Sequence, residues 1–232
     1  MKKYTHIFFD LDHTLWDYDA NATETINELL DKYQLVDDHA VDRDTFLKEF
    51  FLINNELWSR FNKGEVDKEF IRTRRFRMVL NKLEVEGFDN IKGLQEDFIT
   101  ECPTKGKLIP GADEIVKKLS KAYTLYIITN GFDDIQHTKV KYCGLEDYFE
   151  EIITSERAQV QKPDPTIFHF AMDLAMVDKS NSLMIGDNIG SDIVGAISAG
   201  IDQVYFNPEN HTNGIKPTYE ITHLDQLADI LL

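Results

Sequence analysis

Short apolar segments alternate with helix-forming segments at the start of the chain and again in its second half. A strand is predicted at Thr5 to Phe9, an apolar and aromatic run that ends at the acidic segment Asp10-Leu11-Asp12. After Pro110-Gly111 similar runs recur, and they predict strands at 123–129, 151–154, 182–185 and 203–206. Helices are predicted between these strands, at 134–142, from Pro165 onward and at 191–199.

This alternation of strands and helices is typical of an α/β fold. Successive βαβ units place their strands parallel in one sheet and their helices on both faces, so we predict a doubly wound, Rossmann-like parallel sheet. Such sheets bind ligands in the crevice beyond the carboxyl ends of the strands. Polar side chains that directly follow predicted strands are therefore the first candidates for function.

The segment between the first strand and Pro103 has a different, helical pattern. Apolar residues recur there at steps of four, three, four and four, which places on one helix face Phe46, Phe50, Ile53, Leu57 and Phe61. Asp42 or Asp44 can cap this helix, a partner helix follows Asp67, and a further short helix is predicted at 94–100. We therefore predict a core formed by residues 1–16 and 104–232, with an inserted α-helical domain at 17–103.

Composition and charge narrow the possible partners. The 232 residues include 25 Lys+Arg and 41 Asp+Glu, a net charge of −16, which disfavours a nucleic-acid polymer. No apolar run approaches the ~18 residues of a membrane span, and Asp10 interrupts the first run before it could serve as a signal sequence. A soluble, cytoplasmic protein without a membrane partner is expected. Cys102 and Cys143 match no disulfide or zinc pattern, and oligomeric state is not predicted.

Two polar segments directly follow predicted strands. Asp10 and Asp12 lie two residues apart after the first strand, although aspartates are also common in turns and helix caps. Thr129-Asn130-Gly131 follows the next strand along the chain. Asn-Gly usually forms a hairpin turn, but here a helix is predicted to follow, and backbone N–H groups at such a junction are well placed to bind an anion.

Two further polar segments lie at the same predicted edge. Lys162 precedes Asp164-Pro165, a pair typical of a helix N-cap and first helical position, which leaves the lysine without an explanation. Gly186-Asp187-Asn188 follows a strand, and Asp192 lies five residues after Asp187. Taken alone, this segment is better explained by Asp187 as a helix cap and Asp192 as a solvated residue.

Together these segments would gather four carboxylates at one sheet edge, namely Asp10, Asp12, Asp187 and Asp192. Their mutual repulsion favours a bound cation, and Mg²⁺ is the natural candidate because it prefers carboxylate and carbonyl oxygens together with substrate phosphate. Lys162, the Thr129 hydroxyl and the junction N–H groups of Asn130 and Gly131 could then donate to a phosphoryl group. An acidic chain can in this way bind an anionic substrate locally.

The four segments resemble, in order, the four motifs of the haloacid dehalogenase superfamily of aspartate-nucleophile hydrolases. Asp10-Leu11-Asp12-His13-Thr14 is similar to the first motif, Thr129 to the second, Lys162 to the third, and Gly186-Asp187 with Asp192 to the fourth. The resemblance spans nearly the whole chain. It implies that residues 1–16 and 104–232 are the catalytic core and that 17–103 are the helical cap domain of the family.

The resemblance also implies a reaction, the hydrolysis of a small-molecule phosphomonoester. In the dehalogenases themselves another residue replaces Asp12, so Asp12 indicates a phosphatase. Asp10, with the ordinary aspartate pKa of ~3.9, would be ionised at neutral pH and would attack phosphorus to form an aspartyl phosphate. Asp12 would protonate the leaving oxygen and then deprotonate the water that hydrolyses the intermediate.

The remaining roles implied by the resemblance concern binding. Mg²⁺ would be held by the Asp10 carboxylate, the backbone carbonyl of Asp12 and Asp187. Asp192 would steady Lys162 or a metal-bound water. The phosphoryl group would be bound by Thr129, Asn130, Gly131 and Lys162, among which Thr129 and Lys162 also serve catalysis.

Within the superfamily, segments 127–132, 55–58 and 75–76 are most similar to the pyrimidine nucleotidase branch. This similarity predicts hydrolysis of nucleoside 5′-monophosphates such as UMP, dUMP and dTMP. Trp58 is either a packing residue or a platform for base stacking, with packing favoured. A solvated or ion-paired helix face is predicted for Arg60, Arg72, Arg74, Arg75 and Arg77.

Two alternative functions remain open at this point. A phosphatase with the same mechanism could act on a sugar phosphate or on phosphoglycolate, and only the cap would distinguish it. A receiver-like signalling domain also combines Asp, Thr or Ser, Lys and Mg²⁺ in a doubly wound sheet, but it stores the phosphoryl group instead of turning it over. The inserted helical domain favours a hydrolase over a receiver domain.

Overall fold

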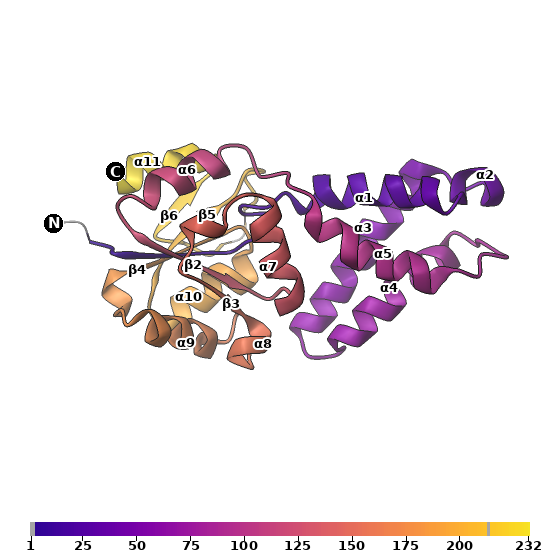
Figure 1. The fold of residues 1–232 in the computed structure, drawn as a ribbon. Helices are drawn as coiled ribbons and strands as arrows, with labels where there is room; N and C mark the ends of the chain where they lie inside the picture. The colour runs from indigo at the N-terminus through magenta and orange to yellow at the C-terminus, as the bar shows by residue number, and fades with distance from the viewer. Residues whose placement is uncertain (1–2, 213) are drawn as a thin grey trace. The chain divides into compact units, whose positions relative to one another are not determined.

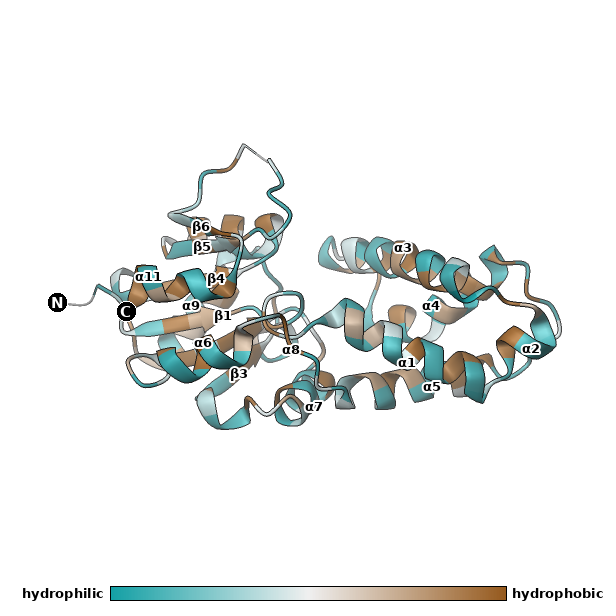
Figure 2. Ribbon diagram, turned by 90° about the horizontal axis from the view of Figure 1, so that it is seen from above, coloured by the Kyte–Doolittle hydropathy of each residue, from teal (hydrophilic) through white to brown (hydrophobic). Residues whose placement is uncertain are grey.

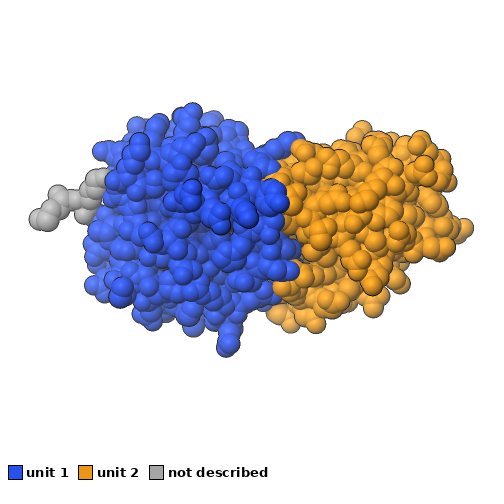
Figure 3. Space-filling view, viewed as in Figure 1, with its two compact units in different colours: residues 1–18, 106–232 blue, residues 19–105 orange. Residues whose placement is uncertain are grey.

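The structure is a computed structural model that describes residues 3–212 and 214–232. The chain forms two compact units (Figure 3): Met1–Tyr18 together with Gly106–Leu232, and Asp19–Lys105. We call them the sheet unit and the helical unit. Their boundaries lie two residues from the positions predicted for the core and the inserted domain.

The described part of the sheet unit contains one six-stranded parallel sheet. The strand order is β3-β2-β1-β4-β5-β6, so the chain builds outward on both sides of β1. The strands are β1 His6–Phe9, β2 Thr124–Thr129, β3 Glu151–Thr154, β4 Ser182–Gly186, β5 Asp202–Phe206 and β6 Tyr219–Ile221. Phe9 at the end of β1 is level with Ile127 in β2 and Ile185 in β4. The residues after β1 therefore emerge between two neighbouring strand ends, at a topological switch point.

Helices cover both faces of the sheet (Figure 1). The helices of this unit are α6 Ala112–Leu119, α7 Asp133–Tyr142, α8 Ser155–Ala158, α9 Pro165–Ala175, α10 Val194–Ala199 and α11 Leu227–Leu231. Figure 1 shows α6 and α11 on one side of the sheet and α9 and α10 on the other. Single helical turns lie at Glu146–Tyr148, Lys179–Asn181 and Leu224–Gln226. The predicted doubly wound α/β fold is confirmed.

The core beneath α9 and α10 explains why these helices form. Phe8 and Met184 point from the sheet to the same cluster as Phe168 and Ala196, and all four are fully buried. Full burial of Phe8, Met184 and Phe168 contributes about 1.5–3 kcal/mol each, and the methyl group of Ala196 contributes less. In Figure 2 the helices carry hydrophobic residues on part of their surface and hydrophilic residues on the rest, as amphipathic packing requires.

The helix predicted at 191–199 is different in detail. It begins as a π-helical turn, Ile189–Ile193, and continues as α10. Its N-cap is Asn188, whose side-chain oxygen accepts hydrogen bonds from the backbone N–H groups of Gly190 and Ser191 at 3.0 Å. The alternative interpretation of Asp187 as the cap is therefore wrong, and its carboxylate has other partners.

The helical unit is built on aromatic packing. Its helices are α1 Tyr18–Lys32, α2 Leu35–His39, α3 Arg43–Asn62, α4 Lys68–Lys82 and α5 Ile91–Glu101, followed by the turn Cys102–Thr104. The rings of Phe50, Phe76 and Phe98 come from three helices and lie with centroids 5.2–5.4 Å apart. Trp58 packs edge-on against Phe61, with centroids 5.4 Å apart.

The prediction that the arginines of this unit lie on a solvated face is wrong for Arg75. Its side chain is buried, and its guanidinium lies 4.5 Å from the Phe98 ring centroid and donates to the Asn54 side-chain oxygen at 2.9 Å. The flat guanidinium packs on the aromatic face, which offsets part of the cost of removing its charge from water. Among the described residues, no helix is long and apolar enough to cross a membrane.

Packing between α9 and α10 depends on a glycine. A Cβ at Gly195 would lie 2.5 Å from Phe168 Cε2 and 3.0 Å from the Pro163 Cα. We expect Gly195→Ala to lower the free energy of unfolding by about 1–3 kcal/mol, because overpacking forces the neighbours apart. Urea unfolding measures this loss. Gly190→Ala is the matched control, since its Cβ meets only Asn188 Oδ1, at 3.4 Å, and an equal loss in both variants would contradict the packing argument.

Candidate active site

The site begins with the loop that follows β1. The Asp10 backbone N–H still pairs with the sheet, donating to the Ile185 carbonyl at 2.8 Å, which places its side chain at the carboxyl edge. The loop then turns tightly, because the N–H groups of Leu15 and Trp16 both donate to the Leu11 carbonyl at 2.9 Å. The Asp10 side chain is therefore held by a rigid strand and a compact turn.

Lys162 is the central cation of the site. Its buried Nζ lies 2.5 Å from Asp10 Oδ1, 2.8 Å from Asp192 Oδ1 and 2.7 Å from the Ile128 carbonyl, so three acceptors match its three N–H donors. Burial opposes the charge of Lys162, but the carboxylates of Asp10 and Asp192 outweigh it and raise the pKa of the ammonium. The lysine therefore stays charged.

The loop that carries Lys162 is held by Asn130. The Asn130 side-chain amide donates to the Lys162 carbonyl at 2.9 Å, and its oxygen accepts from the Lys162 N–H at 2.8 Å. Asp164 then caps α9 by accepting from the Thr166 N–H at 2.9 Å, with Pro165 at the first helical position as predicted. The Asn130 side chain thus holds the Lys162 backbone in position, and only the backbone N–H of Asn130 stays a candidate for binding phosphate.

Thr129 ends β2 beside this loop. Its side chain is buried, and its Oγ1 accepts a hydrogen bond from the Gly131 N–H at 2.9 Å. A Cβ at Gly131 would lie 1.8 Å from Gln136 Nε2, so any other residue there would force the Gln136 side chain to move. The Asn-Gly pair opens a strand-to-helix junction here, and the hairpin interpretation is wrong because α7 follows.

Asp187 is positioned by Thr14, from the loop after β1. The Thr14 hydroxyl donates to Asp187 Oδ1 at 2.8 Å and accepts from the Asp187 N–H at 3.0 Å. Asp192 packs against the end of β4, where a Cβ at Gly186 would lie 2.3 Å from Asp192 Oδ2. The same Asp192 oxygen accepts from the Asn188 N–H at 3.0 Å. Two loops thus place these carboxylates beside Asp10.

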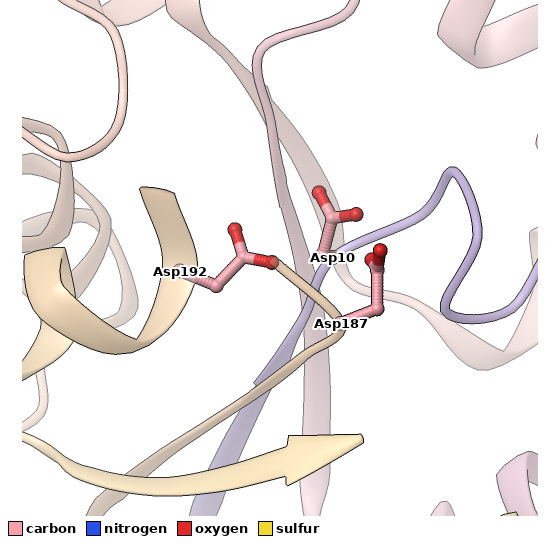
Figure 4. Close-up of side chains that lie close together, drawn as sticks. All are labelled: Asp10, Asp187 and Asp192. Carbon is pink, nitrogen blue, oxygen red and sulfur yellow. The ribbon is translucent and has the colours of Figure 1, made fainter. Parts of the chain in front are cut away.

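The structure brings together Asp10, Asp187 and Asp192, whose carboxylates turn toward one another in Figure 4. One oxygen from each lies within 4.8 Å of the others. With Lys162 the formal charge is 1 − 3 = −2, in a largely buried place. Burial raises the pKa of Asp10 well above its ordinary range. The charge of Lys162 lowers this pKa, whereas the negative charges of Asp192 and Asp187 raise it further. Burial and the charge of Asp192 raise the pKa of Asp187 to about 7.

These pKa directions correct the assumption of an ordinary aspartate at position 10. In the metal-free protein its carboxylate is disfavoured by its surroundings, and a divalent cation would balance the excess charge. The donor set, buried carboxylate oxygens without nitrogen or sulfur, fits a hard cation such as Mg²⁺. Asp192 is already bonded through both oxygens, to Lys162 and to the Asn188 N–H. Asp10 and Asp187 are therefore the better direct ligands.

The carboxylate of Asp12 has different partners, both on α7. Its Oδ1 lies 2.5 Å from Lys139 Nζ, and its Oδ2 accepts from Gln136 Nε2 at 3.2 Å. Of the carboxylates described, only the other three form the cluster. Gln136 and Lys139 were not predicted as site residues, and Thr14 was part of the first motif without an assigned role. A usable signal was the spacing of Gln136 and Lys139, three residues apart on a predicted helix and therefore on one face.

Comparison with known proteins identifies the family of this chain. A family model described as a haloacid dehalogenase-like hydrolase matches residues 4–200. The chain belongs to this family of hydrolases. It is therefore an enzyme, and the match favours turnover over the storage role of a receiver domain.

Relatives within the haloacid dehalogenase-like family cover the whole length of the chain. The pyrimidine 5′-nucleotidase PynA of Streptococcus pneumoniae is 32% identical, over 98% of this chain and 95% of its own. The pyrimidine 5′-nucleotidase YjjG of Escherichia coli is 31% identical, over 99% and 98%. The magnesium-bound crystal structure of the HAD-hydrolase YfnB from Bacillus subtilis superposes with a TM-score of 0.87 at 28% identity, covering 99% of both chains.

The raised pKa of Asp187 predicts how pH affects the metal-free protein. A proton is bound more tightly in the folded state, so this contribution to stability is fully present below the unfolded pKa of ~3.9 and is lost as pH rises through about 7. We expect the stabilisation by Mg²⁺ to increase as pH rises from ~3.9 to about 7, since the ion replaces the proton on Asp187.

Thermal unfolding of EDTA-treated protein across this pH range, with and without Mg²⁺, measures both effects. Asp187→Asn is the control, because it removes one of the two carboxyl groups with a raised pKa in this cluster together with a metal ligand, and it should reduce both the Mg²⁺ shift and its dependence on pH. A Mg²⁺ shift in wild-type protein that is equal at all pH values would contradict the prediction.

Proposed function

We propose that this hydrolase is a Mg²⁺-dependent phosphatase that cleaves nucleoside 5′-monophosphates, with pyrimidine nucleotides preferred. The single observation that carries the proposal is the buried contact of Asp10 with Lys162, next to Asp187 and at the end of the central strand. The substrate class rests on the similarity over the full length to two pyrimidine 5′-nucleotidases. We assign the cap role, and with it substrate selection, to residues 17–103.

The first half of the reaction uses Asp10 and Asp12. An Asp10 carboxylate oxygen attacks phosphorus, the bond from phosphorus to the 5′ oxygen breaks, and Asp12 gives its proton to that oxygen. Lys162 holds Asp10 on one oxygen and offsets its charge and that of the phosphoryl group. Thr129 and the backbone N–H groups of the Asn130-Gly131 junction bind phosphoryl oxygens. The nucleoside leaves, and the phosphoryl group is bonded to Asp10.

The second half releases phosphate. Water attacks phosphorus, the bond to Asp10 breaks, and Asp12 accepts the proton of the water. When bound by the Asp10 carboxylate, the Asp12 carbonyl and Asp187, Mg²⁺ supplies positive charge that keeps both aspartates ionised and offsets the charge of the phosphate. Asp192 keeps Lys162 in place at 2.8 Å throughout.

Asp10→Asn tests the nucleophile. We expect turnover to fall by on the order of 10³ or more, because the amide keeps the shape of the side chain but is a poor nucleophile. Phosphate release from UMP measures this, and circular dichroism verifies the fold. Asp113→Asn is the control, since its exposed pair with Lys117 lies on α6 and should not affect the rate. Ordinary activity in Asp10→Asn would exclude the mechanism.

A substrate panel tests the substrate class. We expect kcat/KM for UMP, dUMP and dTMP to exceed that for phosphoglycolate and sugar phosphates by at least about tenfold, since a nucleotidase would bind the base as well as the phosphate. Each rate is measured with Mg²⁺ and again with excess EDTA, where it should be lost. Preference for a sugar phosphate would assign the chain to the alternative substrate class while leaving the chemistry intact.

A further inference from the structure

Lys139 on α7 is a buried lysine outside the four polar segments that the sequence predicts at the sheet edge. Only 6% of its side chain is exposed, and its Nζ lies 2.5 Å from Asp12 Oδ1. The ammonium also lies over aromatic rings, 4.3 Å from the Trp16 centroid and 5.7 Å from that of Tyr18. A buried ammonium needs such partners, because removal from water is costly. The surroundings therefore hold the lysine in one place, directed at Asp12.

Gln136 binds the other oxygen of the same carboxylate. It lies one turn before Lys139, is buried, and donates from Nε2 to Asp12 Oδ2 at 3.2 Å. Its Oε1 is buried and accepts no hydrogen bond from any residue that the structure describes. The reverse orientation of the amide would place oxygen against a carboxylate oxygen. The side chain thus leaves one polar atom unsatisfied while it donates to Asp12.

The backbone of Asp12 is fixed as well. The backbones of Trp16 and Asp12 form an isolated β-bridge, and the Trp16 carbonyl accepts a hydrogen bond from the His13 N–H at 2.9 Å. Trp16 therefore shapes the loop of Asp12 and also packs against Lys139. With one donor on each oxygen and a fixed backbone, both side-chain torsions of Asp12 are determined.

We propose that Lys139 is a positioning residue that, with Gln136, holds Asp12 as the carboxylate that accepts the proton of water in the second half-reaction. This inference rests on the proposed function. After Asp12 has given its proton to the leaving oxygen, it is the negatively charged species that two donors on α7 bind well. Water then attacks the aspartyl phosphate, the bond between Asp10 and phosphorus breaks, and the proton moves to Asp12.

Lys139→Met tests the proposal because it removes the charge and keeps an unbranched side chain. With p-nitrophenyl phosphate we expect kcat to fall on the order of 10-fold to 100-fold, while kcat/KM changes less than about threefold. Since only the second half slows, acid-quenched enzyme should contain a larger fraction of covalent phosphoenzyme. Lys141→Met, an exposed lysine on the same helix, is the control and should match wild type.

Asp12→Ala and the double variant Asp12→Ala, Lys139→Met complete a cycle. If Lys139 acts through Asp12, its loss should change the rate of Asp12→Ala by less than about twofold. The proposal would be overturned if the rate losses of Asp12→Ala and Lys139→Met multiplied in the double variant. It would also be overturned if Lys139→Met lowered kcat and kcat/KM equally without extra phosphoenzyme. Because p-nitrophenyl phosphate contains no nucleobase, these results do not depend on whether the enzyme prefers nucleotides. Ordinary turnover in Asp10→Asn would instead reject the proposed chemistry.

Gln136→Met provides a second test that leaves the lysine unchanged, and it decides the matter if Lys139→Met does not fold. It removes the donor to Asp12 Oδ2 together with the unsatisfied oxygen. We expect a fall in kcat of at least about threefold, with the same rise in phosphoenzyme. No rise in phosphoenzyme in a folded Gln136→Met protein would overturn the positioning role.

Discussion

The buried ammonium of Lys162 is the interaction on which the site depends. It joins three chain segments that are far apart in sequence, since it contacts Asp10 after β1, the Ile128 carbonyl in β2 and Asp192 after β4. A buried lysine without these acceptors would be strongly destabilising, so the fold must keep the three strand ends aligned for as long as the lysine is inside. The parallel order with β1 in the centre makes that alignment possible.

Electrostatics couples this interaction to metal and substrate. Three carboxylates against one ammonium leave negative charge in a buried place, and the raised pKa values of Asp10 and Asp187 show that the polypeptide alone does not balance it. A divalent cation would supply the positive charge that the site lacks. With the cation bound, the site could accept the negative charge of a phosphomonoester. An acidic protein can in this way take an anionic substrate without any broad basic surface.

The sequence was sufficient for the architecture and for placing Asp10, Asp187 and Asp192 together at the strand ends, but it wrongly added the Asp12 carboxylate to this cluster. Periodicity located β1 to β5, and the parallel order then implied that the side chains after them lie together. It missed β6, whose three residues are too short for a pattern. It also missed Lys139 and misjudged Arg75, because both are charged residues on helices and only tertiary structure shows which charged side chains are turned inward. The sequence offered Asp187 as the cap of the helix that follows β4, whereas the structure shows that Asn188 caps it.

Two glycines in the site have a consequence for redesign. At Gly131 any side chain would collide with Gln136, and at Gly186 any side chain would displace the carboxylate of Asp192. Neither position therefore accepts even a methyl group unless Gln136 or Asp192 moves. If these side chains support catalysis as proposed, a change of specificity should begin elsewhere in the chain, where a larger residue fits without moving them.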